Sequence, residues 1–87
     1  MLKHNNIKQI GSASFQFFPD LVTVDLSYNN LLWIQEKTFE EQRILINLDL
    51  SHNRLERITN LTFIGLESLE FLDLTQNHLT ELGNFSF

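Results

Sequence analysis

The sequence contains no cysteine, and this absence removes several kinds of chemistry at once. Without thiols the chain has no disulfides, no zinc site built on thiolates and no cysteine nucleophile. Glycine is also scarce, because only Gly11, Gly65 and Gly83 are present, and no glycine-rich loop can be assembled from them. Thiol-based catalysis and phosphate binding by a glycine-rich loop are therefore excluded.

Basic side chains are few and do not cluster. Six Lys and Arg residues are scattered singly among eleven Asp and Glu residues, and the net charge is −5. No basic patch exists to release counterions from phosphates, so we expect neither nucleic acid nor an acidic membrane as the main partner. No apolar run approaches the roughly 20 residues of a transmembrane helix, and the start of the chain lacks a signal peptide's apolar stretch. We expect a soluble segment that does not insert into a membrane.

What the chain does contain is a sequence pattern that repeats every 24 residues. The stretch LDLSHNRL at residues 48–55 recurs as VDLSYNNL at 24–31 and as LDLTQNHL at 72–79. Residues 1–20 fit as a repeat without its first four positions. A period of this length predicts a solenoid, in which each unit buries its apolar face against its neighbours. We interpret the chain as one array, with partial repeats at 1–20 and 69–87 and full repeats at 21–44 and 45–68.

The pattern LxxLxLxxNxLxxIxxxxFxxL resembles the leucine-rich repeat family. The length of 24 residues and the late Phe are similar to the typical class of that family, which is common in animal extracellular proteins such as Toll-type receptor, immune and adhesion ectodomains. The resemblance covers essentially the whole chain. It implies an α/β repeat fold, a right-handed solenoid with a short parallel β-sheet on its concave face and an irregular or short helical convex side.

The strand position can be derived from the residues alone. Leu48 and Leu50 alternate with Asn47, Asp49 and Ser51, which is the period of a strand with one buried face. Strands repeated at a constant spacing in one direction must pair in parallel. We expect the chain to return through the segment of Ile58 and Phe63, whose side chains line the opposite wall of the core.

One asparagine recurs in the slot that follows each strand. The chain turns sharply there, and backbone groups left inside the coil need hydrogen-bond partners. A side-chain amide offers two donors and a carbonyl acceptor. We hypothesise a structural ladder that bridges each coil to the next, and the alternative is a set of exposed turn asparagines. The ladder consists of Asn5, Asn29, Asn53 and Asn77.

The residues between the strand leucines point outward, and the resemblance implies that they form a concave recognition surface. This face is acidic and rich in hydrogen-bonding groups, and its aromatic residues are candidate anchors. We therefore expect a protein or peptide partner with a basic patch. The alternative is that Asp-Leu-Ser, the commonest filling of these slots in the family, carries no specific signal. The ligand-binding candidates are Thr23, Asp25, Ser27, Tyr28, Asn47, Asp49, Ser51, His52, Phe71, Asp73, Thr75 and Gln76, and His4 shares the slot of Tyr28.

We expect no metal, cofactor or catalysis at this surface. A column of aspartates at a strand spacing of about 4.8 Å offers fewer oxygen ligands than a metal site needs. Asp49, Ser51 and His52 resemble a triad only in composition, since no oxyanion donor or pocket accompanies them. Generic repeat residues explain all three, so we predict a binding module and not an enzyme.

Two positions depart from the repeat pattern. Leu32 and Trp33 are apolar where the other repeats have charged or polar residues, and they predict a contact point beside the concave face. The alternative is that Trp33 packs over the flank. Gln42 occupies the slot of Phe18 and Leu66, which predicts a looser return path in that coil.

Two stretches, NLT at Asn60 and NFS at Asn84, match the acceptor pattern for N-glycosylation and fall in one slot. The alternative is structural, because Thr62 and Ser86 share a slot with other hydroxyl residues and are candidate turn or helix caps. We expect an extracellular or cell-surface parent protein. The absence of cysteine and of a signal peptide favours the alternative of a cytoplasmic scaffold or regulatory subunit.

The ends of the chain predict a piece of a longer array, and the alternative is a complete small protein. Extracellular members of the family usually carry cysteine-rich caps, and the chain has none. Terminal units of a solenoid need a polar outer face, whereas the last coil would present Leu69, Leu72 and Leu74 to water. End-to-end association through such coils is one expected way to cover them.

Overall fold

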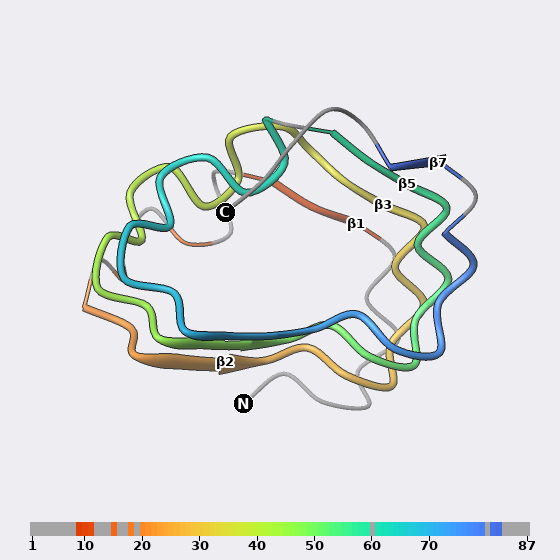
Figure 1. The fold of residues 1–87 in the computed structure, drawn as a ribbon, viewed down its shortest axis with the longest axis horizontal. Helices are drawn as coiled ribbons and strands as arrows, with labels where there is room; N and C mark the ends of the chain where they lie inside the picture. The colour runs from red at the N-terminus through yellow and green to blue at the C-terminus, as the bar shows by residue number, and fades with distance from the viewer. Residues whose placement is uncertain are drawn as a thin grey trace.

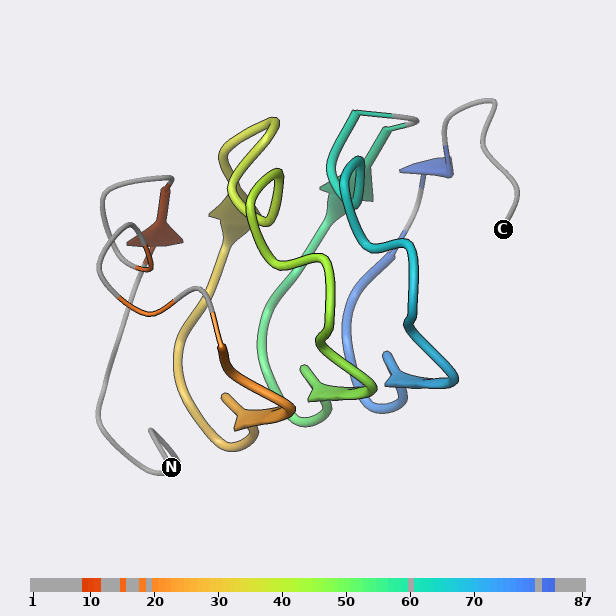
Figure 2. The same cartoon turned by 90° about the vertical axis from the view of Figure 1, so that its left-hand side faces the viewer.

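The computed structural model describes residues 9–11, 15, 18, 20–59, 61–79 and 81–82. Successive coils lie behind one another in Figure 1, and the perpendicular view of Figure 2 shows them side by side. The described residues form seven short strands, which lie on two walls of these coils. The strands are β1 (Gln9–Ile10), β2 (Thr23–Asp25), β3 (Trp33–Ile34), β4 (Asn47–Asp49), β5 (Arg57–Ile58), β6 (Phe71–Asp73) and β7 (Glu81–Leu82).

The first wall is a parallel sheet of three strands in the order β2-β4-β6, as the repeat predicts. Each residue pairs with the residue 24 positions later, so that Asp25, Asp49 and Asp73 lie in one row. The pairing continues beyond the strands, because the amide of Leu26 donates to the carbonyl of Asp49 at 2.8 Å. The constant repeat length therefore fixes the register of the sheet.

The second wall carries two further parallel pairs, β1 with β3 and β5 with β7, which the sequence did not predict. Between the walls the chain makes tight turns at 36–41 and 61–65. Hydrogen bonds three residues apart close these turns, as from the Thr38 amide to the Gln35 carbonyl at 3.2 Å. The described residues contain no helix, so turns and two-residue strands form this side of the coil. The right hand of the coil stays a prediction.

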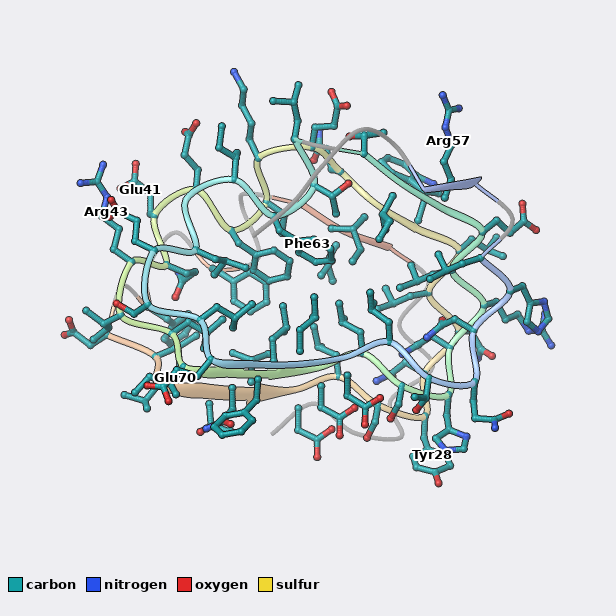
Figure 3. All side chains as sticks on the ribbon, in the orientation of Figure 1. Tyr28, Glu41, Arg43, Arg57, Phe63 and Glu70 are labelled. Carbon is teal, nitrogen blue, oxygen red and sulfur yellow. The ribbon has the colours of Figure 1, made fainter. Side chains whose placement is uncertain are left out.

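The core lies between the two walls and is built from the same slot of each coil. Val24 and Leu48 face inward from the sheet, and Ile34 and Ile58 face them from the second wall. Phenylalanine rings close one end, with centroids 5.5 Å apart for Phe15 and Phe39 and 6.1 Å apart for Phe39 and Phe63. Figure 3 shows Phe63 pointing into this interior. Apolar side chains thus stack on their own counterparts along the array.

Burial decreases in the last described coil. The leucines of the preceding coil are buried, whereas their counterparts in the last coil are only partly buried and pack against one side. The partly buried leucines are Leu69, Leu72, Leu74 and Leu79. A solenoid coil obtains its full core only from neighbours on both sides.

The asparagines hold the turns that follow the strands. Asn53 is 4% exposed, and its Nδ2 donates to the carbonyls of Leu50 at 3.0 Å and Ser51 at 3.1 Å in its own coil. The same Nδ2 lies 3.0 Å from the Leu26 carbonyl of the preceding coil, and Oδ1 accepts from the Leu31 amide at 3.1 Å.

Asn77 repeats this arrangement one coil later. Its Nδ2 donates to the Leu50 carbonyl at 2.9 Å, and its Oδ1 accepts from the Leu55 amide at 2.9 Å. Asn29 is buried and donates to the carbonyls of Leu26 and Ser27. Asn5 lies outside the described residues. The side chains of Asn29, Asn53 and Asn77 therefore form hydrogen bonds with backbone groups of the turns. Those of Asn53 and Asn77 also connect one coil to the coil before it.

Candidate binding surface on the concave sheet

The outward side chains of β2, β4 and β6 line one shallow depression of about 730 Å³. Thr75, just after β6, also lines the depression as predicted, and Glu70 lines it although the sequence did not indicate it. Glu70 occupies the slot of Val22 and Ile46, so the repeat gave no signal of an acid there. The predicted residues that the depression brings together are Thr23, Asp25, Asn47, Asp49, Phe71, Asp73 and Thr75.

The aspartates of this face have a structural role as well. Oδ1 of Asp49 accepts hydrogen bonds from the Ser51 amide at 3.0 Å and the Ser51 hydroxyl at 2.7 Å. Asp25 with Ser27 and Asp73 with Thr75 form the same pair of bonds. This is the local turn in which a short acidic side chain accepts a hydrogen bond from the backbone amide two residues later. The carboxylates are thereby held in fixed positions along the row.

Five of the predicted contact residues do not line the depression, and two of these five are serines. Ser27 and Ser51 are 2% and 5% exposed, and their hydroxyls donate to Asp25 and Asp49. Their counterpart Thr75 in the last coil is exposed. The serines thus support the aspartates and are not themselves displayed to a ligand.

The electrostatic character of the depression is acidic. Asp25, Asp49, Glu70 and Asp73 line it, and no described residue of its lining is a Lys or Arg. The hydrogen bond from the Thr75 hydroxyl, followed by that from the Thr75 amide, holds the pKa of Asp73 below its ordinary value, and the nearby His52 acts in the same direction. Burial opposes this shift of the Asp73 pKa. Asp73 therefore keeps its negative charge at neutral pH.

Aromatic side chains lie at the two ends of the strands. Phe71 begins β6 and is 62% exposed, which makes it the most exposed large apolar residue of the described part. After the strands end, the rings of Tyr28 and His52 stack with centroids 4.1 Å apart and planes 8° apart. Figure 3 shows Tyr28 pointing outward from the corner beside the sheet. An acidic row thus runs between two exposed aromatic groups.

The exposed residues at this corner have an unusual backbone. Tyr28, His52 and Gln76 have φ angles of 56°, 55° and 57°, in the left-handed region that non-glycine residues seldom occupy. Amide hydrogen bonds hold this turn, as from Tyr28 to the Ser51 carbonyl at 3.1 Å and from His52 to the Thr75 carbonyl at 3.0 Å. The turn directs these three side chains to the rim of the depression, outside its lining.

Trp33 does not lie on the concave sheet. It belongs to β3 on the second wall, where it pairs with Gln9, and Figure 1 places β3 across the coil from β2. Trp33 is 46% exposed and Leu32 is exposed as well, and neither residue lines the acidic depression. A contact role for this pair stays a prediction.

The hydroxyl residues before the phenylalanines serve the turns. The Thr62 hydroxyl is buried and accepts from the Thr59 amide at 2.9 Å, and the Thr38 hydroxyl donates to the Gln35 carbonyl at 2.5 Å. This agrees with the structural interpretation of Thr62. Asn60 and Asn84, the candidate glycosylation sites, lie outside the described residues, as does His4.

The three residues that resemble a triad are not arranged as one. In a triad the histidine lies between the serine and the acid, but the Ser51 hydroxyl donates directly to Asp49, and His52 stacks on Tyr28. Among the described residues, no group of three or more His, Asp or Glu side chains is placed to hold a metal ion. Asp49, Ser51 and His52 therefore do not form a catalytic triad.

Comparison with protein families matches residues 19–79 to a family model described as leucine rich repeat. Comparison with curated proteins finds no match, and comparison with solved structures finds none either. Within the described residues, no helix has the length and apolar character needed to cross a membrane.

Proposed function

The chain belongs to the leucine-rich repeat family, whose domains generally mediate protein–protein binding, and on this premise we propose that it is a recognition module that binds a protein or peptide through its concave face. Domains of this kind are typically not enzymes. The observation that carries the proposal is the acidic depression over β2, β4 and β6, which contains an exposed phenylalanine and, in the part of the chain that the structure describes, no basic side chain.

The chemistry of the depression favours a basic partner. The carboxylates of Asp49 and Asp73 lie in register on adjacent strands, and each is fixed through Oδ1 by the residue two positions later. Fixed charges of one sign attract the opposite charge without a cost of reorganisation on binding. A segment with two or more Lys or Arg residues would meet this row.

Phe71 and Tyr28 supply the apolar part of the proposed contact. Large aromatic side chains dominate the energy of many protein interfaces because they bury much area at a modest cost in side-chain entropy. Phe71 lies at the start of β6, and Tyr28 lies at the rim after β2. A ligand that spans the strands therefore fits best if it carries apolar residues on either side of its basic residues.

A selection from a peptide library displayed on phage tests this proposal. We expect the immobilised 87-residue chain to enrich peptides that combine basic and apolar residues. The affinity of a selected peptide should fall on Asp73→Asn, which keeps the Oδ1 acceptor of the turn, and on Phe71→Ala. Glu41→Gln removes the same charge at an exposed position on the turn side and should leave binding unchanged (Figure 3). Enrichment of acidic peptides, or equal losses in all three variants, would contradict the proposal.

We propose further that the parent protein is extracellular or at the cell surface, as in receptor, immune or adhesion proteins of this repeat class. Support comes from the two glycosylation patterns at Asn60 and Asn84, which occupy one slot. A cytoplasmic scaffold or regulatory subunit is the second candidate. Expression through a secretory pathway separates them, since a glycosidase-sensitive mass shift that Asn60→Gln and Asn84→Gln abolish is expected only for the first.

The partly buried leucines of the last described coil support a proposal of end-to-end self-association in the isolated chain. A second coil stacked on Leu72 and Leu74 would remove their remaining apolar surface from water. Light scattering over a range of concentrations is the test. A mass that stays at 10.2 kDa throughout would rule this association out.

A further inference from the structure

The imidazole of His52 is held in a fixed place at the rim of the concave depression. Its ring stacks on the ring of Tyr28, with centroids 4.1 Å apart and planes 8° apart. The His52 amide donates to the Thr75 carbonyl at 3.0 Å, which holds the turn in its left-handed conformation. The side chain of His52 is nevertheless exposed. The ring is therefore positioned by its neighbours and is open to protons from the solvent.

His52 acts on the charge of the depression through Asp73, which lines it. Hydrogen bonds from Thr75 lower the pKa of Asp73 most, and the charge of His52 lowers it as well, which shows that the imidazole lies within electrostatic reach of this carboxylate. A proton on His52 adds a positive charge next to the negative one. The field that attracts a basic ligand to the depression therefore weakens when His52 is protonated.

The other charged groups near His52 do not explain a change of charge at mildly acidic pH. Tyr28 faces it from the coil before, Asp49 and Arg54 belong to its own coil, and Asp73 acts on it from the coil after. Between pH 8 and pH 5, histidine is the side chain that ordinarily gains a proton. No described residue in the lining of the depression is a histidine, so His52 at the rim is the group that responds in this range.

The stack with Tyr28 accommodates both forms of the imidazole. A neutral imidazole packs on the tyrosine as one aromatic ring on another. A protonated imidazole is a cation, and the face of an aromatic ring attracts cations. Protonation of His52 therefore changes the charge of the rim without requiring the side chain to leave it.

We propose that His52 makes recognition by the concave face depend on pH, so that a basic segment binds at pH 7.5 and binds more weakly at pH 5.5. This regulation rests on the proposed function, because it concerns the same surface and the same kind of partner. One unit charge at a distance of several ångströms through water changes the affinity of a single cation by about threefold. We therefore expect the dissociation constant of a basic peptide to rise about threefold as His52 is protonated.

Isothermal titration calorimetry of the whole chain at pH 7.5 and pH 5.5, at equal ionic strength, measures this change. The probe is the acetylated and amidated peptide Phe-Lys-Lys-Lys-Leu, and the same peptide with glutamine in place of lysine is the neutral control. An unchanged dissociation constant for the lysine peptide, or an equal change for the neutral peptide, would overturn the regulation alone. Absence of binding at pH 7.5 would instead overturn the proposed function, and the regulation with it.

Matched variants assign the effect to His52. His52→Gln should bring the ratio of the two dissociation constants close to one, and glutamine already occupies this slot at Gln76 with a φ of 57°. His52→Lys should bind the lysine peptide weakly at both pH values, and Lys37 shows that lysine adopts such a backbone, with a φ of 66°. The ratio should be retained in His78→Gln, which is exposed outside the depression, and in His4→Gln, which lies outside the described residues. A ratio that persists in His52→Gln, or that is lost in either control, would contradict the proposal.

Discussion

Nδ2 of Asn53 lies 3.0 Å from the carbonyl oxygen of Leu26, a residue of the preceding coil. The same side chain accepts from the Leu31 amide at 3.1 Å, so one amide group binds both edges of the neighbouring turn. This relationship recurs in Asn77, which binds the Leu50 carbonyl and the Leu55 amide. The stacking of coils, and with it the concave sheet, depends on these buried amides.

Replacement of Asn53 should therefore destabilise the whole array. Asn53→Ala leaves the Leu31 amide without its acceptor and should lower the free energy of unfolding by about 2–4 kcal/mol. Asn77→Ala should cost less, because Asn77 is more exposed in the last described coil. Urea unfolding measures both, with the exposed Arg54→Ala as the control, which should change stability by less than about 0.5 kcal/mol. Equal effects of Asn53→Ala and Arg54→Ala would show that the ladder is dispensable.

Gln42 offers a stabilising substitution. Its side chain is 1% exposed, and its Oε1 has no hydrogen-bond partner among the described residues, which is a cost to the folded state. Gln42→Leu should raise the free energy of unfolding by about 1 kcal/mol, since an unsatisfied buried acceptor is removed. The Phe15 carbonyl, which accepts from Gln42 Nε2, retains its bond from the Phe18 amide. A decrease of the urea midpoint would mean that the amide contributes more than its unpaired oxygen costs.

The turn at Gly65 requires glycine. Its φ is 99°, and a Cβ atom there would collide with the backbone of Glu40 in the preceding coil. Gly65→Ala should thus lower the free energy of unfolding by more than about 1 kcal/mol. At Gly11 the added Cβ would meet the flexible end of the Gln35 side chain, so Gly11→Ala should lower the free energy of unfolding by less. Thermal melts of the two variants measure the difference. Similar melting temperatures for the two variants would argue against a close approach of the coils at Gly65.

Asp73 should make stability depend on pH in the acid range. Hydrogen bonds from Thr75 lower its pKa in the folded state below the ordinary value of 3.8. The unfolded chain then binds the proton more readily, so the contribution of Asp73 is present above pH 3.8 and is lost as the pH falls through the lower folded pKa. Asp73→Asn should show a smaller loss of melting temperature between pH 5 and pH 2 than the parent chain. The effect is modest because Asp73 is exposed, and identical pH profiles would exclude it.

The sequence predicted the parts of the fold whose residues recur in every repeat. Leu48 and its counterparts fixed the register of β2, β4 and β6, and the slot of Phe39 and Phe63 predicted the opposite wall of the core. These predictions succeeded because an apolar slot that recurs every 24 residues can only be satisfied by stacking. The recurrence of one asparagine likewise indicated that the backbone of each coil needs the same hydrogen-bond partner.

Other features could not be predicted because no repeated signal marks them. Strands of two residues, such as β3, are too short to show alternation. The left-handed turn at Tyr28 and His52 contains no glycine, so composition gives no indication of it. The interruption of pairing between β3 and β5 could not be predicted either, and the sequence indicated the Thr62 hydroxyl only as a candidate turn or helix cap.

Hydrogen–deuterium exchange tests recognition through the concave face most directly. The amides of the chain are compared with and without a peptide obtained from the library selection, at a concentration that saturates binding. We expect slower exchange in β2, β4 and β6 and in the residues up to Gln76 that follow β6, with unchanged exchange in the turns at 36–41 and 61–65. Protection confined to those turns or to β3 and β5, with none in the concave sheet, would contradict the proposed function.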